Sequence, residues 1–344
     1  MSLEITTLQE KHLPDAAALV CARFKSLRQR VPVLPRRYEE THVILPMLSR
    51  LALGSPGVVA VRGGRLVGFL TGLVIPVLLG KRTAYSPEWA NGAEPEDSRR
   101  IYGEMYARLS AQWVADGCLA HAVTMLANDE QGIEGWQWMG FGMAGVDGVR
   151  EVKAVEGAGA FKSQISNVKY QSVRELNAVE GDAAQIMVRQ AGRADAATAA
   201  FFIKALEQYM AAPPIFWIHE LEGTEEYLGD SAKALWLAYD GPDAVGCMAI
   251  GPANPDACAI IEDDKTASIM AAFTLETARG QGVATALLNR CLEWARDRGC
   301  ERCAVDYETM NMLAIRFWPK WFQTVCYSLI RCIDERAANA QKAD

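Results

Sequence analysis

Two stretches of the chain repeat the same series of signals about 180 residues apart, and this repeat constrains the fold more than any other sequence feature. Each series holds an aspartate before an apolar helical stretch, a glycine in a hairpin-like segment, a tryptophan on an apolar helical face and an asparagine before aromatic residues. The four pairs occur in the same order: Asp15 and Asp195, Gly68 and Gly246, Trp113 and Trp294, Asn128 and Asn311. A near-constant offset across four unlike signals predicts two copies of one structural unit.

Each copy mixes strands with helices. Glycine turns separate alternating apolar segments, as in hairpins, and each opening aspartate is predicted to be the N-cap of its helix. Gly117 and Gly299 each end an apolar helix just before a further strand. We therefore predict an α/β (α+β) chain with a first domain over 1–150, a connector over 151–184, a second domain over 185–335 and a tail over 336–344.

Composition excludes several classes of function. The net charge of −7 disfavours nucleic acid as a partner, although it is compatible with a cationic substrate. The longest apolar run is broken by Pro76, so no membrane partner is expected, and the N-terminus lacks a secretory signal. Nine cysteines, an odd number, then indicate reduced thiols and a cytoplasmic protein. The Cys300-x-x-Cys303 pair lacks further ligands nearby, so no metal is expected.

One segment of the second copy carries the chemical signal. An apolar strand over 267–275 leads through Arg279-Gly280-Gln281-Gly282-Val283-Ala284 into an amphipathic helix. Glycines at such a turn allow close approach of a ligand, and the free N–H groups of a helix N-terminus bind anions. This segment predicts a phosphate or pyrophosphate site.

Two better-known phosphate motifs fit this segment less well. A P-loop would need Gly-Lys-Ser/Thr, which is absent. A dinucleotide-binding fold has partial support from Gly280-x-Gly282-x-x-Thr285 and from Asp306 further on, but the segment lies in the last quarter of the chain rather than at the start of a βαβ series. A nicotinamide-dependent oxidoreductase therefore stays open as a less favoured reading.

The same segment resembles the (Gln/Arg)-x-x-Gly-x-(Gly/Ala) motif of the GNAT superfamily of acetyl-CoA-dependent N-acetyltransferases. The segment Asn311 to Trp318, followed by Trp321-Phe322, resembles that family's closing motif. The resemblance covers about 186–335 well and, through the repeat, 3–150 more weakly. It implies two tandem GNAT-like domains, each a mixed, mostly antiparallel sheet flanked by helices with splayed central strands.

The resemblance also implies a cofactor site for acetyl-CoA. Backbone N–H groups of Gln281, Gly282, Val283 and Ala284 would hold the pyrophosphate, flanked by Arg279 beside Gly280. Thr274 and Leu275 would pair with the pantetheine amides, and a backbone N–H there would stabilise the oxyanion. Asn311 would contact the pantetheine side, and Trp318 would pack on the cofactor or donate a hydrogen bond to sulfur.

The catalytic residues depart from the family pattern. Trp318 stands where the family often has a tyrosine that protonates the leaving thiolate, and an indole cannot act as a general acid. Tyr307 and Glu308, just before Asn311, are our predicted catalytic residues, with Glu276 and Asp306 as further candidates for the base. Direct attack of a primary amine on acetyl-CoA is expected. The acceptor amine and the oligomeric state are not encoded in any recognisable motif.

The first copy keeps only half of the phosphate motif, as Arg100-x-x-Gly103, and carries Glu96 and Asp97 just before it. We expect it to be degenerate, with a structural or substrate-shaping role. An aromatic segment over 85–89 is predicted to be a loop, and 209–227 is the expected region of acceptor selectivity. The alternative to an acetyltransferase is a non-catalytic acyl-CoA-binding or scaffold protein.

Overall fold

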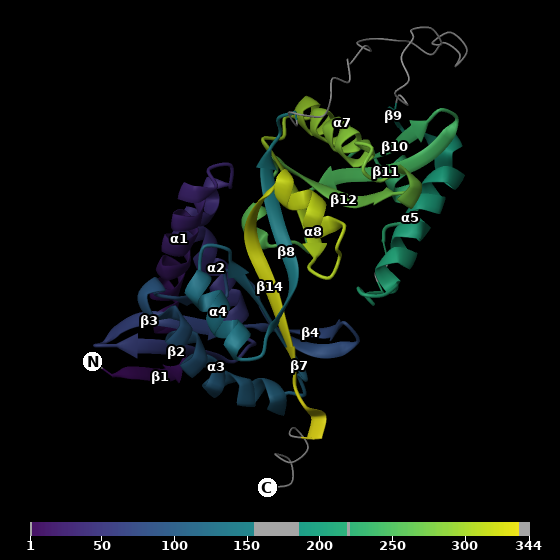
Figure 1. Ribbon diagram of the computed structural model, residues 1–344. Coiled ribbons are helices and arrows are strands. Elements are labelled where there is room, and N and C mark those ends of the chain that lie inside the picture. Colours follow the sequence, from purple (N-terminus) through teal and green to yellow (C-terminus); the bar gives the residue numbers. More distant parts are fainter. Residues whose placement is uncertain (1, 155–185, 219–220, 337–344) are drawn as a thin grey trace.

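A computed structural model describes residues 2–154, 186–218 and 221–336 of the chain (Figure 1). Most of the predicted connector therefore lies outside the described residues. In the described part of the chain, no helix is long and apolar enough to cross a membrane.

The first half, up to residue 151, alternates strands and helices in the predicted order. The hairpin predicted around Gly68 forms, because Gly63 and Gly64 take φ values of 59° and 77° that suit a tight strand turn. The elements are β1 (Leu3–Thr7), α1 (Leu13–Arg30), α2 (Thr41–Ala52), β2 (Gly57–Arg62), β3 (Arg65–Thr71), β4 (Leu73–Leu78), β5 (Lys81–Ser86), β6 (Asn91–Ala93), α3 (Ser98–Ala115), β7 (Ala120–Leu126), α4 (Glu130–Trp138) and β8 (Gly142–Glu151).

The second half, from residue 186, repeats this order with a longer sheet. Its elements are β9 (Met187–Gln190), α5 (Ala196–Ala211), α6 (Thr224–Gly229), β10 (Ala234–Asp240), β11 (Asp243–Pro252), β12 (Thr266–Thr274), α7 (Val283–Asp297), β13 (Arg302–Glu308), α8 (Ala314–Phe317) and β14 (Gln323–Cys332). Helices α7 and α5 cover opposite faces of this sheet. Along β11, alternate residues accordingly join two clusters: Met248 packs with α7, and its neighbour Cys247 packs with α5.

The two halves exchange their last strands. β8, from the first half, pairs antiparallel with β13 of the second half, and β14, from the second half, pairs antiparallel with β7 of the first. β8 and β14 also pair with each other, so they run side by side through the middle of the molecule (Figure 1). The resulting ten-stranded sheet is continuous across both halves, in the order β4-β5-β7-β14-β8-β13-β12-β11-β10-β9.

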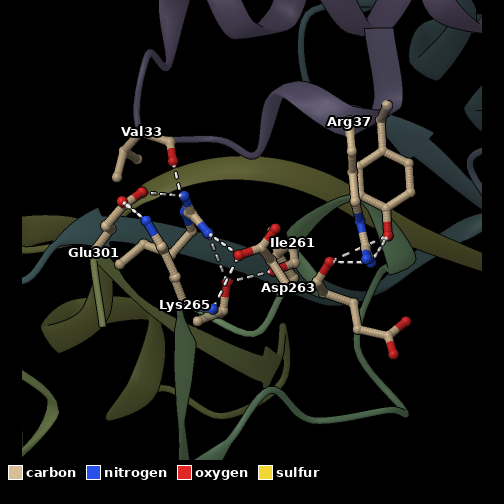
Figure 2. A network of polar contacts seen from close by, with 10 residues as sticks. Val33, Arg37, Ile261, Asp263, Lys265 and Glu301 are labelled. Carbon is tan, nitrogen blue, oxygen red and sulfur yellow. Dashed lines mark hydrogen bonds and ion pairs between the residues drawn. The ribbon is translucent and has the colours of Figure 1, made fainter. Parts of the chain in front are cut away.

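Polar contacts add to this junction (Figure 2). The Arg302 guanidinium, at the start of β13, donates to the Val33 carbonyl at 2.7 Å and pairs with Asp263 at 3.0 Å. Beside it, Arg37 of the first half donates to the carbonyl of Glu262. Because Arg302 is buried, its ion pair with Asp263 is shielded from water more than a surface pair.

Three local predictions, about two helices and one loop, are wrong. Asp15 lies inside the first turn of α1, after a short 3-10 turn, instead of at its N-cap. Asp195 does hold the N-cap position of α5, but its carboxylate accepts from Gly192 N–H and Arg189, and no side-chain cap forms. Tyr85 and Ser86 belong to strand β5, which pairs with β7.

The last of these errors concerns the first copy's half-motif. Helix α3 already begins at Ser98, so Arg100 and Gly103 lie within the helix and form no loop before it. Pro95 starts the preceding 3-10 turn, and the helix follows directly from it.

Candidate active site

The second half holds an opening between two strands of its sheet. β12 and β13 are parallel and pair only from Thr266 with Arg302 to Ile269 with Val305. Beyond Ile269, β12 continues to Thr274 beside β11 alone, with a bulge where Met270 has no counterpart between Ala249 and Ile250. Among the described residues, the backbone edge of β12 that faces β13 therefore has no strand partner from Met270 to Thr274.

A cavity of about 430 Å³ occupies this opening. Strand β12, the turn before α7, helix α5 and the segment around α8 all contribute to it. Its walls are mainly apolar, with a few polar groups. The lining residues are Leu206, Tyr209, Cys247, Met248, Ala272, Phe273, Thr274, Ala278, Arg279, Gly280, Gly282, Val283, Ala284, Thr285, Asn311, Leu313, Ala314, Phe317, Trp318 and Lys320.

The glycine turn forms one end of the cavity. Gly280 and Gly282 have φ values of 77° and 83°, in the left-handed region that L side chains rarely adopt. A Cβ at either position would meet nothing within 4 Å, so the backbone is open to a ligand. Gly282 is the N-cap of α7 and provides no side chain, which leaves the N–H groups of the first turn without an intrahelical acceptor. This geometry suits an anion.

Arg279 adds a positive charge beside the turn. Its Nε donates to the Thr274 carbonyl at 3.2 Å, which ties the turn to the end of β12. Its guanidinium carbon lies 5.9 Å from the centre of the Tyr209 ring. The end of β12, the turn and α5 are thus linked around one side chain.

A polar pair lies on the opposite wall. Asn311 Oδ1 accepts from the Ala314 N–H at 3.1 Å, which caps α8, and from the Tyr209 hydroxyl at 3.4 Å. Asn311 Nδ2 is 3.7 Å from the sulfur of Met210. The asparagine therefore joins α5 to α8 across the cavity mouth.

The structure brings together most of the predicted cofactor residues. Thr274, Arg279, Gly280, Gly282, Val283, Ala284, Asn311 and Trp318 line the cavity. Leu275 lies just outside it, with its N–H donated to the Val245 carbonyl at 2.9 Å. Gln281 is exposed, and its side-chain amide donates to the Thr277 carbonyl at 2.9 Å, so only its backbone faces the turn.

The predicted catalytic residues lie beyond the cavity lining. Tyr307 is buried in the core under α7 together with Trp318, and this burial raises the pKa of its phenol. Glu308 is half-buried at the end of β13. Asp306 points to the opposite face of the sheet, where it accepts from Asn254 Nδ2 at 3.1 Å, and Glu276 is exposed.

Trp318 combines two environments. It is 6% exposed and packs edge-to-face on Phe317 and Phe322, with ring centres 4.8 and 5.5 Å away, yet it also lines the cavity. It thus supports the wall and contacts whatever the cavity holds.

Sequence reasoning missed several lining residues. Leu206 and Phe273 are ordinary apolar residues in sequence, and Lys320 follows the closing motif without a pattern of its own. Tyr209 falls at the start of the region expected to select the acceptor, but its contact with Asn311 could not be inferred. No local sequence signal marks this contact, because Tyr209 and Asn311 lie 102 positions apart.

Comparison with known proteins bears on this site. Residues 202–322 match the family described as "Acetyltransferase (GNAT) family", and this range contains the strand opening, the glycine turn and the cavity. Residues 202–322 of this chain are therefore similar to the GNAT family. The match shows a similarity to acetyltransferases over this range.

Individual relatives agree with the GNAT assignment. Rat N-acetyltransferase 8B is 29% identical over 98 residues, which are 28% of this chain and 41% of that protein, so the match spans less than half of the relative's length. A GCN5-related N-acetyltransferase from Sphaerobacter thermophilus superposes with a TM-score of 0.53 and 13% identity, over 96% of this chain and 95% of that structure.

A second solved structure supports the same fold. It is the GCN5-related glucosamine N-acetyltransferase region of a fungal multi-domain GH3 β-N-acetylglucosaminidase, with a TM-score of 0.50 and 11% identity. The alignment covers 96% of this chain and 38% of the fungal structure. Both structural matches extend through the two halves, and the predicted mixed sheet with splayed central strands is confirmed.

Proposed function

We propose that the GNAT domain of the second half transfers an acetyl group from acetyl-CoA to a primary amine of a small molecule or peptide. The observation that carries this proposal is the cavity between β12 and β13, which joins a free strand edge to an anion-binding helix N-terminus. Acetyl-CoA has the matching parts: a pyrophosphate, an amide-bearing pantetheine arm and a thioester.

The cofactor-binding residues follow from this fit. The N–H groups of Gln281 to Ala284 hold the pyrophosphate at the glycine turn, and Arg279 neutralises part of its charge. The pantetheine amides extend along the unpaired edge of β12 near Thr274 and Leu275, as an added strand would. Asn311 and Trp318 contact the opposite side of the arm.

The reaction is direct attack by a neutral amine. The amine nitrogen bonds to the thioester carbonyl carbon, an N–H of the β12 edge stabilises the oxyanion, and the carbon–sulfur bond then breaks. The amine gives up one proton and the leaving thiolate takes one up. A lysine-type amine, with a pKa of about 10.4, needs a base for this step, whereas an α-amine near 8 needs less help.

The reaction needs a base that accepts the proton of the amine and an acid that protonates the thiolate. Burial keeps the Tyr307 phenol protonated at neutral pH, so of the two predicted catalytic residues only Glu308 can accept a proton. Trp318 cannot supply the proton that the thiolate needs. We propose that Tyr209 supplies it, since its phenol lines the cavity and is held by Asn311.

The experiment is a panel of amines with acetyl-CoA, read by release of free CoA thiol and by mass of the acetylated product. Turnover of at least one amine supports the proposal. Tight binding of CoA without turnover of any amine favours the non-catalytic acyl-CoA-binding alternative. A thermal shift with NAD and none with acetyl-CoA would reject both.

A further inference from the structure

A second group of reactive side chains lies at the junction of the two halves, on the face of the sheet opposite α7. Asp147 comes from β8, Cys326 from β14 and Cys258 from the segment between β11 and β12. All three are buried, and their possible ligand atoms lie within 4.8 Å of one another. None of them lines the GNAT cavity or enters the proposed reaction.

Chain topology sets this arrangement. Cys326 and Asp147 are direct cross-strand partners, so their side chains stand side by side on one face of the exchanged strands. The backbone N–H of Cys258 donates to Asp147 Oδ1 at 3.0 Å, which fixes the carboxylate and brings the Cys258 thiol against that of Cys326. Both halves and the 253–262 segment must fold together before the three groups meet.

A fourth acidic group adjoins them. Glu88, which follows β5, is 2% exposed, and its Oε1 accepts from the Ile260 N–H at 3.0 Å. Its Oε2 is buried and has no hydrogen-bond partner among the described residues. The Glu88 charge acts on Asp147, Cys258 and Cys326, so its carboxylate belongs to the same buried environment.

All four groups are acids, so their ionisation in a buried site needs a compensating positive charge. Asp147, Glu88, Cys258 and Cys326 are all buried, away from the water that would otherwise solvate their charged forms. The cation that acts on Cys326 is Arg23, but its guanidinium already pairs with Asp129 at 2.7 Å and donates to the Asn91 carbonyl at 3.1 Å. Without another cation, the group is favourable only when all four acids keep their protons.

We propose that Asp147, Cys258 and Cys326 bind a Zn²⁺ ion. Two thiolates and carboxylate oxygens are a ligand set that Zn²⁺ accepts in a four-coordinate site, whereas Mg²⁺ and Ca²⁺ avoid sulfur. The ion displaces protons from the ligands and replaces the missing positive charge. Because the site is closed to solvent, its role is structural: it fastens the 253–262 segment to both exchanged strands.

The sequence did not predict this site because its ligands are far apart along the chain. Cys258 and Cys326 have no close-spaced cysteine or histidine partner, and the spacing test applied to Cys300-x-x-Cys303 cannot find them. Only the pairing of β8 with β14 brings them to Asp147.

The test is the metal content of the full chain, purified under reducing conditions without a chelator. We expect about one Zn²⁺ per chain, and after exchange into Co²⁺ the absorption of a four-coordinate cobalt–thiolate centre. Cys258→Ser and Cys326→Ser should lower the bound metal to near zero. Cys291→Ser is the matched control, since Cys291 is equally buried but lies on α7, in another core cluster.

A measurement on the wild-type chain tests the proposal even if the variants do not fold. Removing metal with a chelator should lower Tm, and adding Zn²⁺ alone should restore it. Wild-type protein that holds no metal and gives no cobalt–thiolate absorption overturns the proposal, and so does a Cys258–Cys326 disulfide found in the native chain. None of these readouts depends on acetyl transfer, so the outcome is separate from that of the proposed function.

Discussion

The two halves share a strand order but differ in what lies between their central strands. In the second half, β12 and β13 diverge around an open cavity. In the first half, the corresponding space beside β6 and β7 is filled by side chains. Asn91 of β6 donates to the Thr124 carbonyl of β7 at 3.1 Å and accepts from the Tyr102 hydroxyl at 3.1 Å.

A buried ion pair completes this filling. Arg23 contacts the carbonyl of Asn91 and pairs with Asp129 at 2.7 Å, and Asp129 also accepts from the Ser98 hydroxyl at 3.0 Å. These residues link α1, β6, α3 and α4 through hydrogen bonds. The same fold thus has a cavity in one copy and a polar core at the corresponding place in the other.

The N-terminal ends of α7 and α3 also differ, one being open and the other occupied by side chains. Helix α7 begins after a glycine turn with open space, whereas α3 begins after Pro95-Glu96-Asp97. The surface hollow beside α3 includes Glu96 and Asp97 in its lining, and Asp97 is paired with Arg62. Carboxylates at a helix N-terminus occupy the position that an anionic ligand would need. The prediction that the first copy is degenerate remains a proposal, and these contacts support it.

The largest effect we expect is on CoA affinity, and it distinguishes the N-terminal end of α7 from that of α3. Gly282→Glu places a carboxylate in the proposed pyrophosphate site and forces a side chain into φ 83°, so CoA affinity should fall about a thousandfold. Gly103→Glu, at the matching motif position of α3, is the control and should leave affinity unchanged. Calorimetric titration with CoA measures both. Equal losses in the two variants would contradict the assignment to the second half.

The second-largest effect is on the free energy of unfolding, and it tests the buried polar network around Arg23 in the first half. Arg23→Ala leaves Asp129 buried without its partner and should cost about 4 kcal/mol of unfolding free energy. Arg30→Ala, in the same helix but with an exposed ion pair to Glu130, should cost about 1 kcal/mol or less. Urea denaturation gives both values. A similar loss of unfolding free energy in the two variants would show that the buried network is not what stabilises the first half.

A pH effect should also originate in the first half. His121 is buried, its Nδ1 is 2.8 Å from the Tyr106 hydroxyl, and burial lowers its pKa to about 4. The unfolded chain takes up the proton near pH 6.5, so stability is retained above that pH and lost as pH falls toward 4, by about 3 kcal/mol in total. Denaturation of wild type and His121→Gln across this window should give a smaller pH slope for the variant. An unchanged slope would assign the acid sensitivity to other groups.

The smallest effect concerns the proton for the leaving thiolate. Tyr209→Phe keeps the ring beside Phe273 and removes only the hydroxyl, and kcat should fall about tenfold because a thiolate is a tolerable leaving group without an acid. KM for acetyl-CoA should stay within about twofold. Tyr239→Phe, a tyrosine that pairs with Arg189 away from the cavity, is the control. A loss of binding with unchanged kcat would make Tyr209 a wall residue only.

Sequence reasoning found the parts of the fold that local signals determine. Glycines and apolar periodicity predicted the glycine turn, the start of α7 and the hairpins. The structure has these elements within one or two positions of the predicted residues, and the glycines of the turn have positive φ values. In the aromatic segment at 85–89, Pro87 to Trp89 form a turn as predicted, whereas Tyr85 and Ser86 are in a strand because they pair with β7. Local propensity does not contain that information.

Long-range pairing explains the remaining omissions. β8 and β14 end similar copies and have similar patterns, so no residue in either strand indicates which sheet it completes. The contact of Tyr209 with Asn311 likewise depends on how α5 packs on the sheet. Glu88, Asp147, Cys258 and Cys326 come from four separate segments and meet only in the folded chain.

The exchanged strands have a consequence for how the chain folds during synthesis. When the ribosome has completed the first half, β7 has no β14 beside it, and β8 has no β13. Two unpaired strand edges of this kind are sites of mispairing and aggregation. The first half can finish folding only after β14 has emerged, because β7 pairs with β14. We therefore expect slow, late-stage maturation and a dependence on chaperones that a simple pair of tandem domains would not need.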